Sequence, residues 1–250
     1  VVLAVHSATL SGAAEGLKFY LVPDFSKITG TVIVGAMNQA FFTLSTGMGG
    51  MAIFGSYIDK DHSLMGESVN VIVLDTFVAI LAGFIIFPAC STYGLEVNAG
   101  PSLLFDTMAS VFNHMAGGRI WGTMFFLFMI FAALSTVLGV CENILAMVRE
   151  LTGWSRPKGC IICGTGIFLL ALTTALGYSV IHFQPFAEGT AWLDLWDFIV
   201  SNNVLPLGSL VLTLFCCNKF GWGWDNFVRE ANTGRGLKIR PWMRPVFQYI

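Results

Sequence analysis

Long apolar runs separated by short polar segments dominate this chain of 250 residues. A helix that crosses a bilayer needs about 20 mostly apolar residues. Five runs reach that length and predict five spanning helices, at about residues 31–58, 69–89, 120–148, 159–178 and 192–217. Residues 1–10 read as the end of an earlier helix, and the residues from about Trp242 as the start of a later one. We therefore expect a fragment of a longer chain.

Composition supports a lipid environment. Hydrophobic residues make up 55% of the chain and charged residues only 11%, against about 25% charged residues in typical soluble domains. The predicted fold class is all-α, a polytopic transmembrane helical bundle that forms one transmembrane domain over residues 1–250. The sequence shows no basic segment followed by an apolar one as in a secretory signal peptide, so none is expected among these residues. The formal net charge of −2 argues against nucleic acid as a partner, so the expected surroundings are membrane lipid.

The basic residues of the loops predict the orientation of the helices, because Lys and Arg concentrate on the cytoplasmic side of membrane proteins. Three basic residues lie in one set of loops and ten in the other. The smaller set contains Lys18, Lys27 and Arg119. The larger set, predicted to be cytoplasmic, contains Lys60, Arg149, Arg156, Lys158, Lys219, Arg229, Arg235, Lys238, Arg240 and Arg244. The long outer loop at about 91–119 has apolar spacings that predict one or two short amphipathic helices.

The first predicted helix contains glycine and hydroxyl residues at mid-membrane depth. Residues 43–50 include Gly47, Gly49 and Gly50 together with three hydroxyl side chains. Each glycine costs a helix interior about 1 kcal/mol relative to alanine, so the segment predicts an unwound stretch. Irregular backbone at this depth lines a cavity or is buried in protein, and broken helices form substrate and ion sites in transporters. Close helix packing through small residues is the structural alternative.

A stripe of small residues marks the third helix. Ala132, Ser135, Thr136 and Gly139 share one face, which Glu142 continues. Hydroxyl and carbonyl oxygens on such a face suit a small hard cation, and helix packing is again the alternative.

Ionisable residues and cysteines supply the other candidates. Asp75 lies within an apolar helix, where a carboxylate is costly and is by default a functional hypothesis. Asp194 and Asp197 begin the fifth helix, where their charge is favourable at the helix N-terminus. Six cysteines are present. The pair Cys160 and Cys163 is a redox or metal candidate, but the favoured interpretation is two small apolar residues.

These segments together resemble the neurotransmitter:sodium symporter family, in its bacterial amino-acid transporter branch. The strongest match is residues 39–49 (QAFFTLSTGMG), which resemble the broken sixth helix of that family. Leu74-Asp75 with Phe87-Pro88 resembles the seventh helix, Gly100-Pro101 the long outer loop, and residues 132–142 the eighth helix. The resemblance covers nearly the whole chain. It implies the second inverted repeat of a LeuT-type fold with a broken first full helix, running from the end of helix five to the start of helix eleven. The partner would be the missing N-terminal repeat of the same protein.

The resemblance also implies roles for individual residues. The substrate would contact six residues: Phe42, Thr43, Ser45, Met48, Thr136 and Val140. One Na⁺ would be held by Thr43 and Asp75, and a second by Ala132, Ser135 and Thr136. The gate residues would be Phe42, Tyr57, Glu150 and Asp197.

One departure from the family bears on chloride. Asp75 stands where many relatives have Asn, within an anion-site region that also contains Gln39 and Ala79. A carboxylate beside the first Na⁺ would replace the anion, so chloride is expected not to be required.

The expected function is sodium-coupled symport of an amino acid, hydrophobic or aromatic, across the bacterial cytoplasmic (inner) membrane by alternating access. No nucleophile, metal cluster or phosphate loop indicates an enzyme. Three alternatives stay open: a proton-coupled transporter using Asp75 or Glu142, a non-transporting binding subunit, and a redox protein using Cys160 and Cys163.

Overall fold

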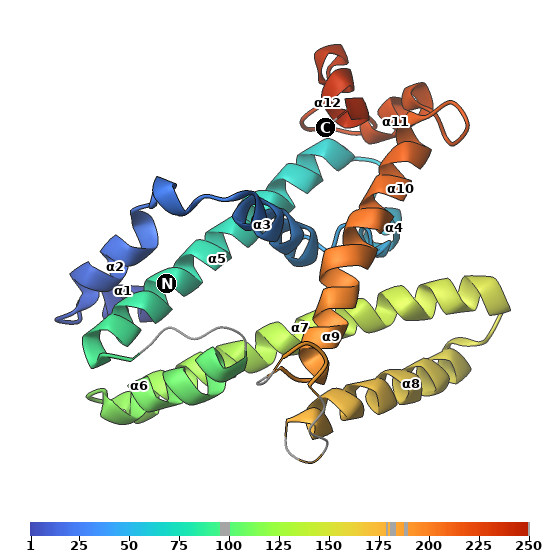
Figure 1. Ribbon diagram of the computed structural model, residues 1–250. Coiled ribbons are helices and arrows are strands. Elements are labelled where there is room, and N and C mark those ends of the chain that lie inside the picture. The colour runs from blue at the N-terminus through green and yellow to red at the C-terminus, as the bar shows by residue number, and fades with distance from the viewer. Residues whose placement is uncertain (96–100, 179, 181–183, 188–189, 250) are drawn as a thin grey trace. The chain divides into compact units, whose positions relative to one another are not determined.

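The computed structural model describes residues 1–95, 101–178, 180, 184–187 and 190–249, which form helices joined by short connections (Figure 1). Among these residues the only β-type pairing is an isolated bridge between His62 and Arg235. Gly100 of the predicted outer loop lies outside the described residues.

The described elements follow one another with few long connections. The α-helices are α1 (Val2–Ala8), α2 (Ala13–Leu21), α3 (Gly30–Thr43), α4 (Gly50–Ser56), α5 (Leu64–Tyr93), α6 (Met108–His114), α7 (Gly118–Thr152), α8 (Arg156–Gly177), α9 (Trp192–Ile199), α10 (Leu205–Cys217), α11 (Trp224–Ala231) and α12 (Arg244–Tyr249). Short 3₁₀ or π segments are η1 (Phe25–Lys27), η2 (Leu103–Thr107), η3 (Val200–Val204) and η4 (Pro241–Met243).

Four of the described helical segments are long and apolar enough to cross a membrane. They are α5, α7, α8 and the continuous stretch from Trp192 to Cys217 that contains α9, η3 and α10. The first predicted helix appears as two shorter pieces, α3 and α4. The predicted amphipathic helix of the outer loop corresponds to α6, which follows the π-helical turn η2.

The last span has an irregular centre that the apolar pattern did not predict. Residues 200–204 form a π-helical turn that ends two residues before Pro206. Proline has no backbone N–H and cannot continue the hydrogen-bond ladder of the preceding turn. Asn203 Nδ2 also donates to the Phe198 carbonyl, 2.9 Å away and five residues earlier. Turns of this type recur at functional sites.

The chain divides into two compact units. The first comprises residues 1–29 and 73–136, and its core gathers α1, η2, α6, the C-terminal part of α5 and the start of α7. Cys90, Met108 and Val111 are fully buried there. Tyr20 of α2 stacks on Phe87 at 4.7 Å between ring centroids. Gly83 permits this packing, because a Cβ there would lie 2.2 Å from the Tyr20 ring.

The second unit comprises residues 30–72 and 137–250. Two of its loops form a clasp, which we define as residues 61–63 paired with residues 235–237. Ser63 N donates to Arg235 O at 2.9 Å, and Arg235 N donates to Asp61 O at 2.7 Å. Ser63 Oγ donates to Leu237 O at 2.8 Å, and the Ser63 residue is only 1% exposed. The clasp therefore joins the start of α5 to the segment that follows α11.

Candidate functional site

The break in the first helix lies between Thr43 and Gly50. Three of its residues have left-handed backbone: Ser45 with φ 52°, Gly47 with φ 80° and Gly49 with φ 79°. Glycine adopts this conformation freely, whereas it is uncommon for other residues. The prediction of an unwound stretch from three closely spaced glycines is therefore confirmed.

The backbone of the break turns back on the end of α3. Thr46 N donates to Phe41 O at 3.0 Å, and Thr46 Oγ1 contacts the same carbonyl at 3.3 Å. Phe42 remains 46% exposed at the end of this helix. The ends of two half-helices thus meet within six residues, an arrangement that transporters use to bind charged groups.

Helix α10 packs directly against the break. A Cβ on Gly47 would lie 2.2 Å from Leu205 O, and a Cβ on Gly208 would lie 2.3 Å from Gly47 O. Both glycines are therefore required for the backbones to approach this closely. The break is fixed by packing and is not only a locally weak stretch of helix.

The C-terminal part of α7 contacts the other side of the break. The Asn143 amide donates to Met48 O at 3.4 Å, and Asn143 is only 9% exposed. Asn143 is also the nearest side chain to a Cβ placed on Gly50, at 3.4 Å. Val140 lies one turn earlier on the same face of α7 and is 36% exposed. Within the second unit, the predicted pocket residues Met48 and Val140 therefore belong to adjoining segments.

The predicted second sodium site has its oxygens together in one helical turn of the first unit. Ser135 Oγ lies 2.8 Å and Thr136 Oγ1 3.1 Å from Ala132 O. Both hydroxyls are exposed rather than covered by other described side chains. These hydrogen bonds are the ones that hydroxyl side chains commonly make to their own helix, so they fit the packing alternative. The same geometry brings three oxygens close together, as a cation site requires. For a cation to bind, each hydroxyl must turn its hydrogen away from Ala132 O.

The remaining predicted ligands are divided between the units. Asp75 is half-buried on α5 and Ala79 lies exposed one turn later, both in the first unit. Gln39 and Thr43 are exposed on α3 in the second unit. The first sodium site, the anion-site region and the placement of Thr136 beside the substrate therefore stay predictions.

The predicted outer-gate acid lies on α9. Asp197 is exposed, and its Oδ1 accepts a hydrogen bond from Ser201 Oγ at 2.6 Å. One residue further along the π-helical turn, Asn202 Oδ1 accepts from Asn38 Nδ2 of α3 at 3.0 Å. Helix α3, the first half of the broken helix, is thus joined to the irregular centre of the last span.

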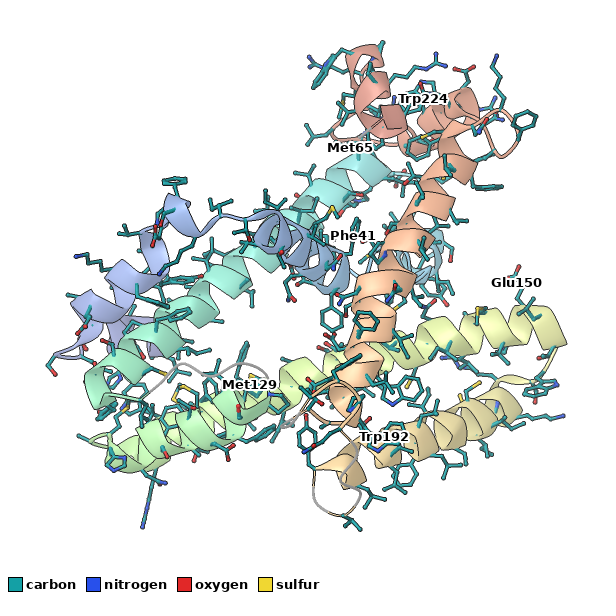
Figure 2. The ribbon with its side chains drawn as sticks, viewed as in Figure 1. Phe41, Met65, Met129, Glu150, Trp192 and Trp224 are labelled. Atoms are coloured by element: carbon teal, nitrogen blue, oxygen red, sulfur yellow. The ribbon has the colours of Figure 1, made fainter. Side chains whose placement is uncertain are left out.

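A polar cluster joins the end of α4, the C-terminal part of α7 and the start of α8. Tyr57, a predicted gate residue at the end of α4, donates to Glu142 Oε1 at 3.3 Å. Arg156 pairs with Glu142 Oε2 at 2.8 Å. Glu150, the other predicted inner-gate residue, is exposed near the end of α7 (Figure 2). The structure thus connects Tyr57 through Glu142 to Arg156 at the start of α8.

Three polar residues of the site were not predicted from the sequence: Asn38, Asn143 and Arg156. Asn143 had a detectable signal, because it stands seven residues after Thr136 on the face of the small-residue stripe. Arg156 was predicted only as a basic residue of a cytoplasmic loop. Asn38 could not be recognised because its hydrogen-bond partner, Asn202, lies 164 residues away. Cys160 and Cys163 lie on α8 as free thiols.

Comparison with known proteins places this geometry in a family. A family model described as the sodium:neurotransmitter symporter family matches residues 1–250. An uncharacterized sodium-dependent transporter of Haemophilus influenzae is 35% identical over 213 residues, 85% of this chain and 47% of the relative. The uncharacterized sodium-dependent transporter YhdH of Bacillus subtilis is 35% identical over 215 residues, 86% of this chain and 48% of the relative. The chain spans about half the length of the curated relatives that it matches.

A solved structure agrees with the fold. The crystal structure of MhsT in complex with L-phenylalanine superposes with a TM-score of 0.87 at 36% sequence identity. The match covers 99% of this chain and 56% of MhsT.

Proposed function

The chain belongs to the sodium:neurotransmitter symporter family, and from this premise we propose that it forms one half of a sodium-coupled amino-acid symporter. The proposed half is the second inverted repeat of a LeuT-type fold, working with a first repeat that corresponds to the other half of its relatives. Transport would run across a bacterial cytoplasmic membrane by alternating access, with the binding site near the midplane between the repeats.

The observation that carries the proposal is the broken helix. Ser45, Gly47 and Gly49 hold a left-handed turn between two half-helices, and α10 packs against it through Gly208. Half-helix ends present unpaired backbone groups and partial charges. These groups would bind the charged amino and carboxylate groups that every amino-acid substrate shares.

Apolar residues beside the break favour a hydrophobic or aromatic substrate. Phe42 is proposed to cover the substrate, while Met48 and Val140 contact its side chain. Methionine is pliable and adapts to irregular partners. That MhsT was crystallised with L-phenylalanine agrees with such a substrate class.

Sodium is proposed to bind where the oxygens of Ala132, Ser135 and Thr136 converge, and the test removes two of them. We expect Ser135→Ala combined with Thr136→Ala, in the complete transporter polypeptide, to raise the Na⁺ concentration for half-maximal uptake about tenfold or more. Hydrogen bonds and dipoles acting on a charged group contribute about 1.5–3 kcal/mol each, and 1.4 kcal/mol is tenfold in affinity.

The control separates ion binding from helix packing. Thr123 lies on the same helix and bonds its own helix in the same way, with Oγ1 2.6 Å from Arg119 O. Thr123→Ala should leave the sodium dependence unchanged. An unaltered dependence in the double variant would reject the sodium site. Uptake that follows a pH gradient and ignores Na⁺ would favour the proton-coupled alternative, and binding without uptake would favour the non-transporting subunit.

A further inference from the structure

The end of the chain differs from the rest in charge and in aromatic content. Residues 218–250 contain six basic and two acidic residues, a net charge of +4, although the whole chain carries −2. The same segment contains three of the seven tryptophans, Trp222, Trp224 and Trp242. Basic residues combined with Trp are typical of the cytoplasmic membrane–water interface.

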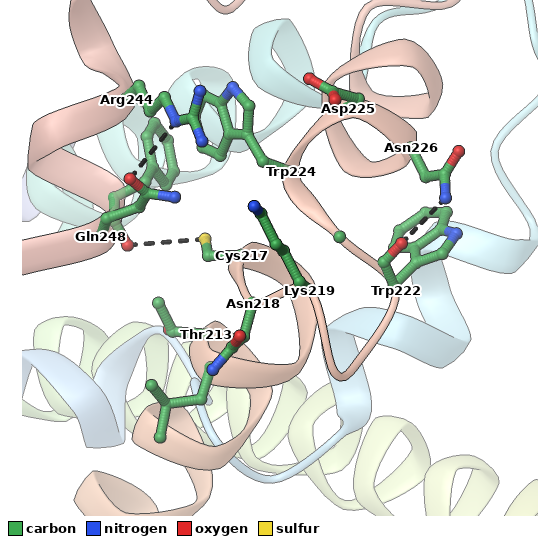
Figure 3. A pocket seen from close by; sticks show the side chains of 13 residues that line it. Thr213, Cys217, Asn218, Lys219, Trp222, Trp224, Asp225, Asn226, Arg244 and Gln248 are labelled. Carbon is green, nitrogen blue, oxygen red and sulfur yellow. Dashed lines mark hydrogen bonds between the residues drawn. The ribbon is translucent and has the colours of Figure 1, made fainter.

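A cavity of about 630 Å³ lies in this segment, between the end of α10, α11 and α12 (Figure 3). Lys219 and Arg244 line it, together with the amides of Asn218 and Gln248. Among the described residues, neither Lys219 nor Arg244 forms an ion pair. Two cationic groups thus face one cavity without a carboxylate bound to either.

The Arg244 side chain is held in place by its neighbours. Its guanidinium lies over the Trp224 ring, 5.9 Å from the centroid, and its Nε donates to Gln248 Oε1 at 3.3 Å. The terminal Nη groups remain to bind a ligand, and a guanidinium fixed in this way can bind a phosphate through two parallel hydrogen bonds. Asp225 also lines the cavity and would weaken the binding of an anion.

The cavity adjoins a membrane span. The last span ends at Cys217, two residues before Lys219, and the loop lies in the set predicted to be cytoplasmic. Phe220, which follows Lys219 in the chain, is 98% exposed, and Trp242, two residues before Arg244, is 68% exposed. Apolar side chains suit acyl chains, and the cations suit a phosphate.

We propose that this cavity binds the phosphate of an anionic phospholipid headgroup, with Lys219 and Arg244 as its ligands. A lipid is a better source of the phosphate than the free ion, because the cavity starts where a span ends and because exposed aromatic residues lie close in the chain to both cations. The cytoplasmic leaflet is also the one that carries anionic lipid.

The test titrates the complete transporter in detergent with short-chain lipids, with native mass spectrometry as the readout. Dioctanoyl phosphatidylglycerol should bind at least about tenfold more tightly than dioctanoyl phosphatidylcholine or inorganic phosphate. Lys219→Gln with Arg244→Gln should lower this affinity about tenfold or more, since both variants remove charged donors that line the cavity, and hydrogen bonds from charged donors to a phosphate are roughly twice as strong as neutral ones.

Two comparisons make the result specific. Lys60→Gln with Arg240→Gln removes the same charge from the same predicted side, but neither residue lines the cavity, so this pair should change the affinity less than about twofold. Asp225→Asn should tighten binding, an outcome that impaired folding cannot imitate. The proposal is overturned if phosphatidylcholine or inorganic phosphate binds as tightly as phosphatidylglycerol. It is also overturned if the control pair loses as much affinity as Lys219→Gln with Arg244→Gln, or if Asp225→Asn does not tighten binding.

Discussion

Replacing Gly208 by alanine tests whether α10 holds the helix break in its functional shape. The new Cβ would lie 2.3 Å from Gly47 O, 3.0 Å from its carbonyl carbon and 3.2 Å from its Cα. Carbon–oxygen contacts normally lie near 3.3–3.6 Å, so the two backbones must separate by roughly 1 Å. The atoms in the way are backbone, which cannot rotate aside as a side chain would.

The magnitude follows from two opposing effects. Overpacking costs about 1–3 kcal/mol, and the greater helix propensity of alanine returns up to about 1 kcal/mol. The protein should therefore fold with slightly reduced stability. The displaced break should affect transport more, because misplacing binding groups by about 1 Å can lower rates by about 100-fold.

Sodium-driven uptake by the complete transporter in proteoliposomes, together with its melting temperature, measures both effects. Gly164→Ala and Gly166→Ala on α8 are matched controls, because a Cβ at either position meets no described atom within 4 Å. They should keep full uptake and gain about 0.5–1 kcal/mol of stability. If Gly208→Ala transports as well as these controls, α10 does not hold the break.

Three further changes test other parts of the structure. Replacing sodium chloride with sodium gluconate should not reduce uptake by the complete transporter, whereas Asp75→Asn should create a chloride requirement. The reason is that a carboxylate about 4 Å from Na⁺ contributes about 4 kcal/mol at an effective dielectric of roughly 20. A wild-type protein that needs chloride would contradict this. Arg156→Ala should remove the ion pair of Glu142 and speed maleimide labelling of the neighbouring Cys141 in inside-out vesicles severalfold, measured by peptide mass spectrometry. Lys158→Ala removes a cation that lies over the Trp154 ring, 4.9 Å from its centroid, and should leave the labelling rate unchanged. In a thermal unfolding assay, Ser63→Ala should lower stability by about 1–2 kcal/mol, since Leu237 O loses a buried hydrogen-bond donor. The control Ser56→Ala, at an exposed position, should cost less than about 0.5 kcal/mol in the same assay.

Sequence pattern predicted the parts of the fold that depend on local chemistry. The break followed from Gly47, Gly49 and Gly50, and the spans followed from apolar runs, because both properties are encoded within a few neighbouring residues. The π-helical turn did not follow, because residues 199–205 read as an ordinary helical segment. Its causes are the missing N–H of Pro206 and a side-chain bond from Asn203.

Features that join distant segments could not be predicted from spacing. Neither Asn38 nor Asn202 stands out in the sequence, and only the folded chain shows that Asn38 Nδ2 donates a hydrogen bond to Asn202 Oδ1 at 3.0 Å. The resemblance to a family did predict roles for Tyr57 and Glu150, but it did not predict that Tyr57 bonds Glu142, since that choice depends on how α4 meets α7.

The clasp between residues 61–63 and 235–237 sets an order of events during synthesis. Ser63 and its acceptor Leu237 are separated by 174 positions. At roughly 5–20 residues per second, the ribosome delivers Leu237 about 9–35 s after Ser63. Throughout that interval the loop before α5 lacks the partners that later bury it. The clasp can therefore form only after nearly all of the described second unit has been synthesised.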